Sequence, residues 1–233
     1  MGFAAAQPVL RAMSHECPMA YRRTERESAR LAARYDTIIK SAQALASESG
    51  LRAVQIAPVA ERAGVAAGTV YRYFPSKEDL VAAVVSDAAQ REVATIRAAA
   101  AAAPGELSGL AAAIMAFGSG TVRMRRLAFA MLSEAPDGDD AGNIAFRRNI
   151  GNEFESLIRA AIAGGHLPEQ PAAVAAAAIL GAIVESLAGP LAPVLAGPDA
   201  RRAAVQRMTL FALRALGVGD ARARGLVLMA GGS

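Results

Sequence analysis

The chain has 233 residues, of which 54% are apolar and 5% aromatic, and its formal net charge at pH 7 is +4. This length and apolar content suffice for one large domain or two small ones, and the abundance of Ala favours helices over sheets. The single cysteine, Cys17, excludes an internal disulfide framework and a zinc site built from cysteines, and it fits a reducing, cytoplasmic setting.

Residues 1–33 are predicted to be a flexible basic leader. Arginines recur near its end at three- and four-residue intervals, namely Arg22, Arg23, Arg26, Arg30 and Arg34. They could contact DNA phosphates or the minor groove, or they could belong to a solvated tail. His15, Glu16 and Cys17 are adjacent in an unpatterned segment, which is usually chance, so neither a metal site nor a cofactor is predicted.

The first predicted helix covers residues 36–49. Its apolar residues form one stripe at helical spacing, and Gly50 ends it. The stripe consists of Ile38, Ile39, Ala42, Leu45 and Ala46. This helix is expected to carry the following two helices.

A helix-turn-helix pattern follows at residues 59–74. Val59, Ala60 and Ala63 give the first short helix an apolar face. Gly64 stands where that helix must stop, at a position that favours a left-handed backbone. Pro75 ends the second helix because it lacks an amide hydrogen. Two short helices joined by a tight turn are the layout of many DNA-binding domains.

The outer side of the second short helix carries small residues and hydrogen-bonding groups. Small side chains let a backbone approach DNA closely, and the polar groups can reach bases or phosphates. The predicted DNA-binding residues on this helix are Ala67, Gly68, Thr69, Tyr71, Arg72 and Tyr73.

The run from Val59 to Leu80 resembles the amino-terminal domain of TetR-family transcriptional regulators, and the resemblance extends over about residues 35–85. It implies an all-α fold with a three-helix DNA-binding domain over 34–80 and a larger helical ligand-binding and dimerisation domain over 81–217. It also implies a phosphate contact for Lys77. Gln55 and Ala66 depart from the pattern because they stand where a capping Ser or Thr is common, and each loss costs about 1 kcal/mol of helix stability.

Six helices are predicted after the DNA-binding pattern, over residues 77–103, 107–117, 122–134, 143–163, 172–191 and 200–216. Turn signals, such as the one at 136–138, separate them. The stretch 172–195 is apolar, but Glu185, Pro190 and Pro193 argue against a membrane span, so no membrane partner is predicted. Residues 218–233 are predicted to form a flexible tail.

The last two long helices are apolar on more than one face, which requires burial. We predict that they pair with the same helices of a second copy to make a homodimer. The two recognition helices would then read a palindromic operator in double-stranded DNA.

Met and Phe residues concentrate in the middle helices. They suit an apolar effector pocket, but they could equally form the core. Glu185 is the strongest candidate for a buried polar contact, either to an effector or across the dimer interface. The candidate effector residues are Phe117, Met124, Leu127, Phe129, Met131, Phe146, Asn149, Ile150, Glu153, Phe154 and Glu185.

An enzyme is not predicted, because the sequence has neither a nucleophile elbow nor a phosphate-binding Gly-rich loop with Lys. The resemblance implies a sequence-specific transcriptional regulator, namely a homodimeric repressor that an unidentified small, largely apolar ligand releases from its operator. The alternative is an interaction or sensor protein that kept the fold without specific DNA binding.

Overall fold

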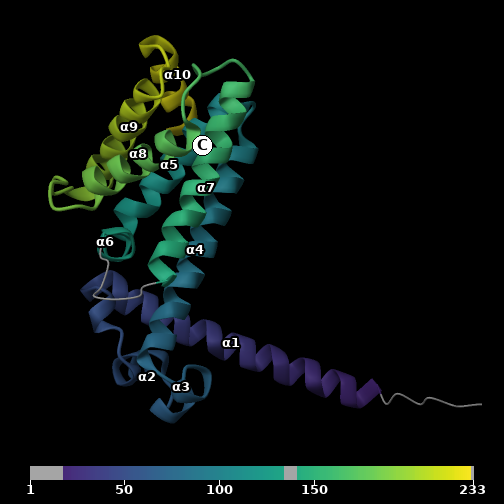
Figure 1. Cartoon of the computed structure of the whole chain (residues 1–233). Helices are drawn as coiled ribbons and strands as arrows, with labels where there is room; N and C mark the ends of the chain where they lie inside the picture. The colour runs from purple at the N-terminus through teal and green to yellow at the C-terminus, as the bar shows by residue number, and fades with distance from the viewer. Residues whose placement is uncertain (1–17, 134–140, 232–233) are drawn as a thin grey trace, which may run out of the picture. The chain divides into compact units, whose positions relative to one another are not determined.

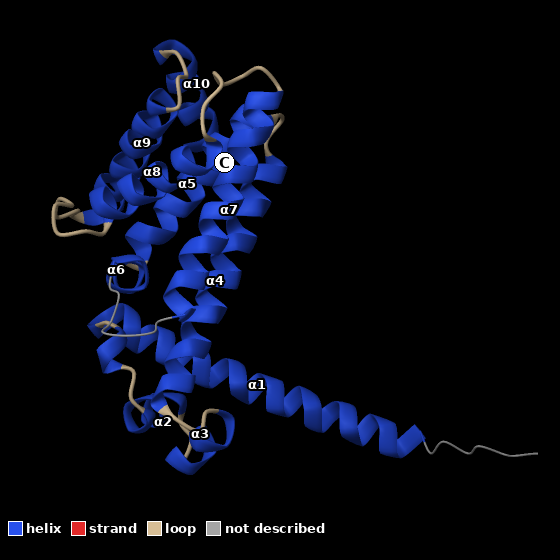
Figure 2. Ribbon diagram, in the orientation of Figure 1, coloured by secondary structure: helices blue, strands red, loops and turns tan. Residues whose placement is uncertain are grey.

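The computed structural model of the chain describes the backbone of residues 18–133 and 141–231 and the side chains of residues 27–129 and 144–231. Within this part, every regular element is a helix (Figure 2), which confirms the predicted all-α fold. Among the described helices, none combines the length and apolar character that crossing a membrane requires. The predicted turn at 136–138 and the possible metal ligands at 15–17 lie outside the described residues.

Helix α1 (Pro18–Ser49) begins well before the predicted start at residue 36. The chain divides into two compact units, 1–37 and 38–233, and the boundary falls within α1. Residues 18–33 are helical where a flexible leader was predicted, because their arginines are interspersed with Ala and Glu, which are good helix formers.

In the second unit, the DNA-binding head consists of residues 38–76 and the start of the next helix. It contains a short 3₁₀ turn (Leu51–Ala53) and helices α2 (Ile56–Ala63) and α3 (Ala67–Tyr73). Its buried residues, all at most 8% exposed, come from α1, α2, α3 and the connecting segments: Ile38, Ile39, Ala42, Ala46, Val54, Ile56, Val59, Ala60, Val70 and Phe74.

The centre of the body is formed by α4 (Lys77–Ala102), α5 (Glu106–Arg123), α6 (Arg125–Ser133) and α7 (Ala141–Ala163). Helix α4 packs against both α5 and α7 (Figure 1). Helix α5 continues beyond its predicted end at residue 117. A Cβ atom at Gly118 would lie 3.1 Å from Val205, and one at Gly120 would lie 2.6 Å from Glu92. These glycines therefore allow close packing between helices and do not end α5.

The carboxy-terminal part contains α8 (Ala172–Leu187), α9 (Gly197–Ala215) and α10 (Asp220–Gly231). Helix α8 ends before the predicted residue 191, since Pro190 disfavours a helical conformation in the residue before it. Helix α10 occupies most of the segment that was predicted to be a flexible tail. It packs against α5 and α9 and buries only Ala223 and Val227. Two buried positions are too few to produce a helical pattern that is recognisable in the sequence.

Candidate DNA-binding surface and effector cavity

The turn between α2 and α3 depends on Gly64. This residue adopts φ 65° and ψ 34°, which is the left-handed region that side chains other than glycine disfavour. The amide of Val65 donates a 3.0 Å hydrogen bond back to the carbonyl of Ala60 and closes the end of α2. Helix α3 begins two residues later, so this geometry confirms the predicted helix-turn-helix.

Helix α3 is held by its inner side and leaves its outer side accessible. Val70 and Phe74 are 0% and 3% exposed. Tyr71 is 54% exposed, while the other predicted DNA-binding residues range from half-buried to exposed. Thr69, Tyr73 and Lys77 are half-buried, and Ala67, Gly68 and Arg72 are exposed. All of the predicted DNA-binding residues are therefore accessible from solvent within residues 67–77.

The start of α4 is fixed by a capping box. The amide of Asp79 donates to Ser76 Oγ at 3.0 Å, and the amide of Ser76 donates to Asp79 Oδ2 at 3.1 Å. These reciprocal bonds satisfy two otherwise unpaired amides. They define the backbone on both sides of Lys77, which is the first residue of α4.

A cavity of about 210 Å³ lies where α1, α4, α5, α6 and α7 meet. Each of these helices contributes to its wall, for example through Gln43, Glu92, Phe117, Leu127 and Phe146. The aromatic and aliphatic groups suit a small apolar molecule, and the polar groups can orient it.

Glu92 is the main polar group in this cavity. Its Oε1 atom is buried and accepts no hydrogen bond from the described residues. Burial raises the pKa of Glu92 to about 7, although the positive charge of Arg123 acts in the opposite direction. Near neutral pH the carboxyl group can therefore either donate or accept a hydrogen bond inside the cavity.

The cavity is connected to the head by hydrogen bonds. Gln43, on α1, lines the cavity and donates through Nε2 to Asp87 Oδ2 on α4 at 2.5 Å. Arg126, on α6, donates to the backbone carbonyl of Glu48 at the end of α1. A change in the positions of α4 or α6 would therefore act directly on α1, the helix that carries the head core.

A family model described as bacterial regulatory proteins of the tetR family matches residues 38–84. Residues 38–84, the DNA-binding head, are therefore an amino-terminal domain of the TetR family. Among curated proteins, the transcriptional repressor KstR of Rhodococcus jostii is 53% identical over 49 residues, which are 21% of this chain and 23% of KstR. The chain therefore matches less than a quarter of the length of this curated relative.

Solved structures of similar fold match most of this chain. RolR in complex with resorcinol has a TM-score of 0.59 at 20% identity and covers 86% of this chain and 95% of its own. FadR from Bacillus subtilis in complex with stearoyl-CoA has a TM-score of 0.58 at 19% identity and covers 84% of this chain and 97% of its own. At these identities the comparison shows a common fold.

The helical body brings together only some of the predicted effector residues. Those that line the cavity are Phe117, Met124, Leu127 and Phe146. Ile150 and Phe154 are fully buried, and Phe154 meets Phe117 edge to face with ring centroids 5.6 Å apart. Both are therefore core residues, and Phe154 supports the cavity wall through Phe117 without lining the cavity itself.

Of the remaining predicted effector residues, none with a described side chain lines the cavity. Glu153 accepts a 2.9 Å hydrogen bond from Arg97 Nε in an ion pair between α7 and α4. Asn149 is exposed, and Phe129 is half-buried outside the cavity wall. Glu185 is also exposed, although its apolar neighbours in the sequence suggested burial. The side chain of Met131 lies outside the described residues.

Sequence reasoning missed Glu92, although a signal was present. Val85, Ala89 and Ile96 are buried on α4 at spacings of four and seven, and Glu92 falls between the last two on the same stripe. A charged residue on the buried stripe of a helix is informative because isolated charges are costly to bury. Only the helices packed against α4 reveal that this stripe faces a cavity at Glu92.

Helices α2 and α3 both lack a side-chain hydrogen bond at the N-cap, so adding one should stabilise the head. Ala66 has the extended backbone of a cap, with φ −69° and ψ 146°, but no side-chain cap bond. Ala66→Ser should therefore raise the free energy of unfolding by about 1 kcal/mol. Urea denaturation measures the change, and Ala67→Ser, one residue inside the helix, is the matched control. Equal stability of the two variants would show that the cap is not limiting.

Proposed function

We propose that this protein is a sequence-specific DNA-binding regulator, a homodimeric repressor that a small, largely apolar ligand releases from its operator. The observation that carries the proposal is the accessible side of α3, supported from behind by the buried Val70 and Phe74. This arrangement leaves Thr69, Tyr71 and Arg72 available for base edges and phosphates, while the helix itself is held rigidly.

The outer face of α8 supports dimerisation. Val174, Ala178, Gly181 and Glu185 are exposed there at helical spacing, and Val174 is 66% exposed. On α9, Phe211 is 56% exposed. An exposed face of apolar and small residues on two adjacent helices suits close packing against a second copy. Glu185 would then make its polar contact across the interface.

The cavity around Glu92 supports a small effector. Its volume of about 210 Å³ is smaller than that of sites for drug-sized ligands, which are roughly 300–1,000 Å³. Resorcinol, which RolR binds, is a small ring with hydroxyl groups. A ligand of that kind could place its ring among Phe117, Leu127 and Phe146 and donate a hydrogen bond to Glu92.

Release from DNA would require two states of the dimer that differ in the spacing of their two DNA-binding heads. A ligand that binds better to the state unable to bind DNA shifts the equilibrium toward that state. Helix α4 would transmit the change, because it lines the cavity at Glu92 and begins in the head at Lys77. The Gln43–Asp87 hydrogen bond links α4 directly to α1.

The proposal is tested by fluorescence anisotropy with the DNA upstream of the protein's own gene, over a salt series and with competitor DNA. Saturable binding that resists competitor is expected, together with its loss on adding small aromatic or aliphatic effectors. If competitor DNA abolishes binding to every candidate operator, the result would instead favour an interaction or sensor protein that kept the fold.

Lys77→Ala should weaken binding to all DNA sequences alike and reduce the salt slope by about one unit, because one phosphate contact is lost. Thr69→Ala should instead relax sequence preference by roughly 1–3 kcal/mol at one base position, if its hydroxyl reads a base. Arg159→Ala removes the same charge from α7 and is the control. An unchanged salt slope in Lys77→Ala would exclude the phosphate contact.

A further inference from the structure

A second, larger hollow lies apart from the Glu92 cavity. It has a volume of about 660 Å³ and runs between α5, α9, α10 and the end of α4. Of the residues that line it, only Arg123 also lines the Glu92 cavity. It is therefore a separate groove, and its size falls in the range of ligand-binding sites.

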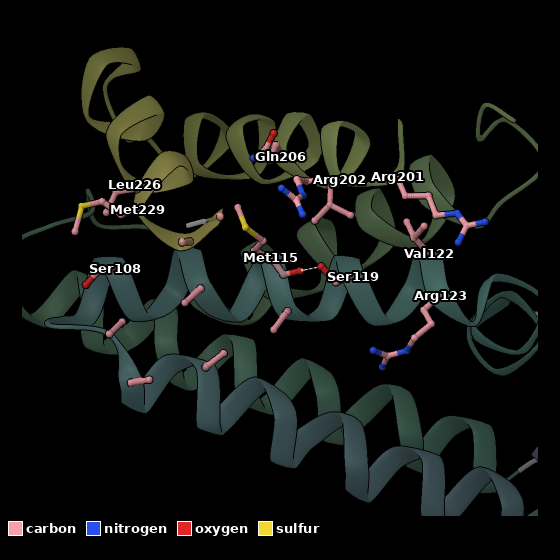
Figure 3. A pocket seen from close by; sticks show the side chains of 18 of the residues that line it. Ser108, Met115, Ser119, Val122, Arg123, Arg201, Arg202, Gln206, Leu226 and Met229 are labelled. Atoms are coloured by element: carbon pink, nitrogen blue, oxygen red, sulfur yellow. Dashed lines mark hydrogen bonds between the residues drawn. The ribbon is translucent and has the colours of Figure 1, made fainter. Parts of the chain in front are cut away.

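The groove is long and mostly apolar. Alanines from α4 and α5 form much of its wall, and these short side chains leave the space open. Leu226 and Met229 line its apolar end, Ser108 lies beside that end, and Met115 lines the middle of the groove (Figure 3). From Ser108 to Arg123 the helix axis rises about 22 Å, which is long enough for an extended hydrocarbon chain.

Positive charge is concentrated over the other half of the groove. Arg201 and Arg202 extend from α9 over the carboxy-terminal half of α5 (Figure 3). Both are exposed, and neither has an ion-pair partner among the described residues; Asp199, in the first turn of α9, pairs with neither. They also lie near the amino-terminus of α9, where the helix dipole adds positive potential.

We propose that this groove binds an anionic amphiphile, with a carboxylate or phosphate head at Arg201 and Arg202 and an unbranched apolar chain along α5. The two guanidinium groups complement the head. The chain lies over the alanines toward Met115, Leu226 and Met229, where burial of its methylene groups stabilises the complex. Helix α10 forms one wall of the groove, and its buried residues Ala223 and Val227 anchor that wall to the body.

The charge distribution selects this ligand class over its alternatives. A neutral hydrocarbon would offer no negative group to pair with Arg201 and Arg202. A simple anion would leave the apolar half of the groove empty. A ligand that carries both groups satisfies the two halves together, and the groove length limits its chain.

The test is isothermal titration of the full chain with decanoate and decyl phosphate, each below its micelle concentration. Decanol and inorganic phosphate serve as chain-only and head-only probes. We expect saturable binding of the anionic amphiphiles and at least about tenfold weaker binding of both partial probes. The stronger of the two amphiphiles identifies the head as carboxylate or phosphate.

Variants locate the site. The double substitution Arg201→Ala and Arg202→Ala should weaken binding at least about tenfold, whereas Arg207→Ala, an exposed position on the same helix outside the groove, should not. Ala116→Phe should block the chain, and Glu92→Gln should leave binding unchanged. Equal binding of decanol, or an undiminished affinity of the double variant, would overturn the proposal, as would loss of binding in Glu92→Gln. None of these outcomes depends on DNA binding.

Discussion

Glu92→Gln is expected to raise the free energy of unfolding at pH 8 by about 3 kcal/mol and to change it little at pH 5. In the native protein, burial raises the pKa of Glu92 to about 7. The folded state then holds the proton more tightly than the unfolded state does. The contribution of Glu92 to stability is therefore most favourable at low pH, falls as the pH rises from below 5 toward 7, and is constant above that. A glutamine side chain cannot ionise and removes this loss.

Urea denaturation of both proteins between pH 4.5 and 8.5 measures the effect. The two stability curves should lie close together at the acidic end and diverge between about pH 5 and pH 7. Glu169→Gln, at an exposed loop carboxylate, is the control and should leave the wild-type curve unchanged. Parallel curves for Glu92→Gln and the wild type would show that Glu92 is solvated and does not lie in a dry cavity.

Arg125→Ala is expected to destabilise the protein by about 3 kcal/mol. The guanidinium group of Arg125, at the start of α6, donates hydrogen bonds to the carbonyl oxygens that end α8 and follow it. These bonds are 3.3 Å to Ala188, 3.2 Å to Gly189, 3.0 Å to Ala192 and 3.3 Å to Pro193. Removing the side chain leaves partly buried carbonyls without a donor, and hydrogen bonds to a charged donor are among the stronger ones.

The same substitution should affect the cavity, because Leu127 and Ala128 follow closely on α6 and line it. Thermal and urea unfolding measure the stability change. Arg125→Lys keeps the charge but not the planar fork of donors, so an intermediate loss is expected. Arg147→Ala, on the exposed side of α7, is the control. A loss as small as that of Arg147→Ala would mean that water replaces the guanidinium group.

Much of the head could be predicted from the sequence because its signals are local. Gly64 marks a left-handed turn, Pro75 ends α3, and Ser76 with Asp79 caps α4, each within a few residues. Such positions depend on backbone conformation and nearby hydrogen bonds and not on distant packing. The matching run of residues also identified the family, which the family model over residues 38–84 confirms.

Some element boundaries in the body could not be predicted. A helix was predicted to end at residue 117, yet Gly118 and Gly120 lie within α5. In the sequence, a glycine that ends a helix cannot be distinguished from a glycine that lets a second helix pack closely against the first. The two roles are distinguished only by the tertiary contacts, in which Val205 lies close to Gly118 and Glu92 lies close to Gly120. Helix α10 was missed for a related reason, since its place depends on α5 and α9.

The candidate effector cavity could likewise be predicted only in part from the sequence. The sequence by itself determined that the chain is helical, where its helix-turn-helix lies, and that Phe117, Leu127 and Phe146 belong to an apolar interior. It could not decide that Glu92 places a carboxylate oxygen in the interior and that Glu185 is exposed, because both lie among apolar residues. Burial depends on which faces of five helices meet, and that arrangement is a property of contacts between residues far apart in the chain. Only the tertiary structure therefore decided which carboxylate lies inside the protein.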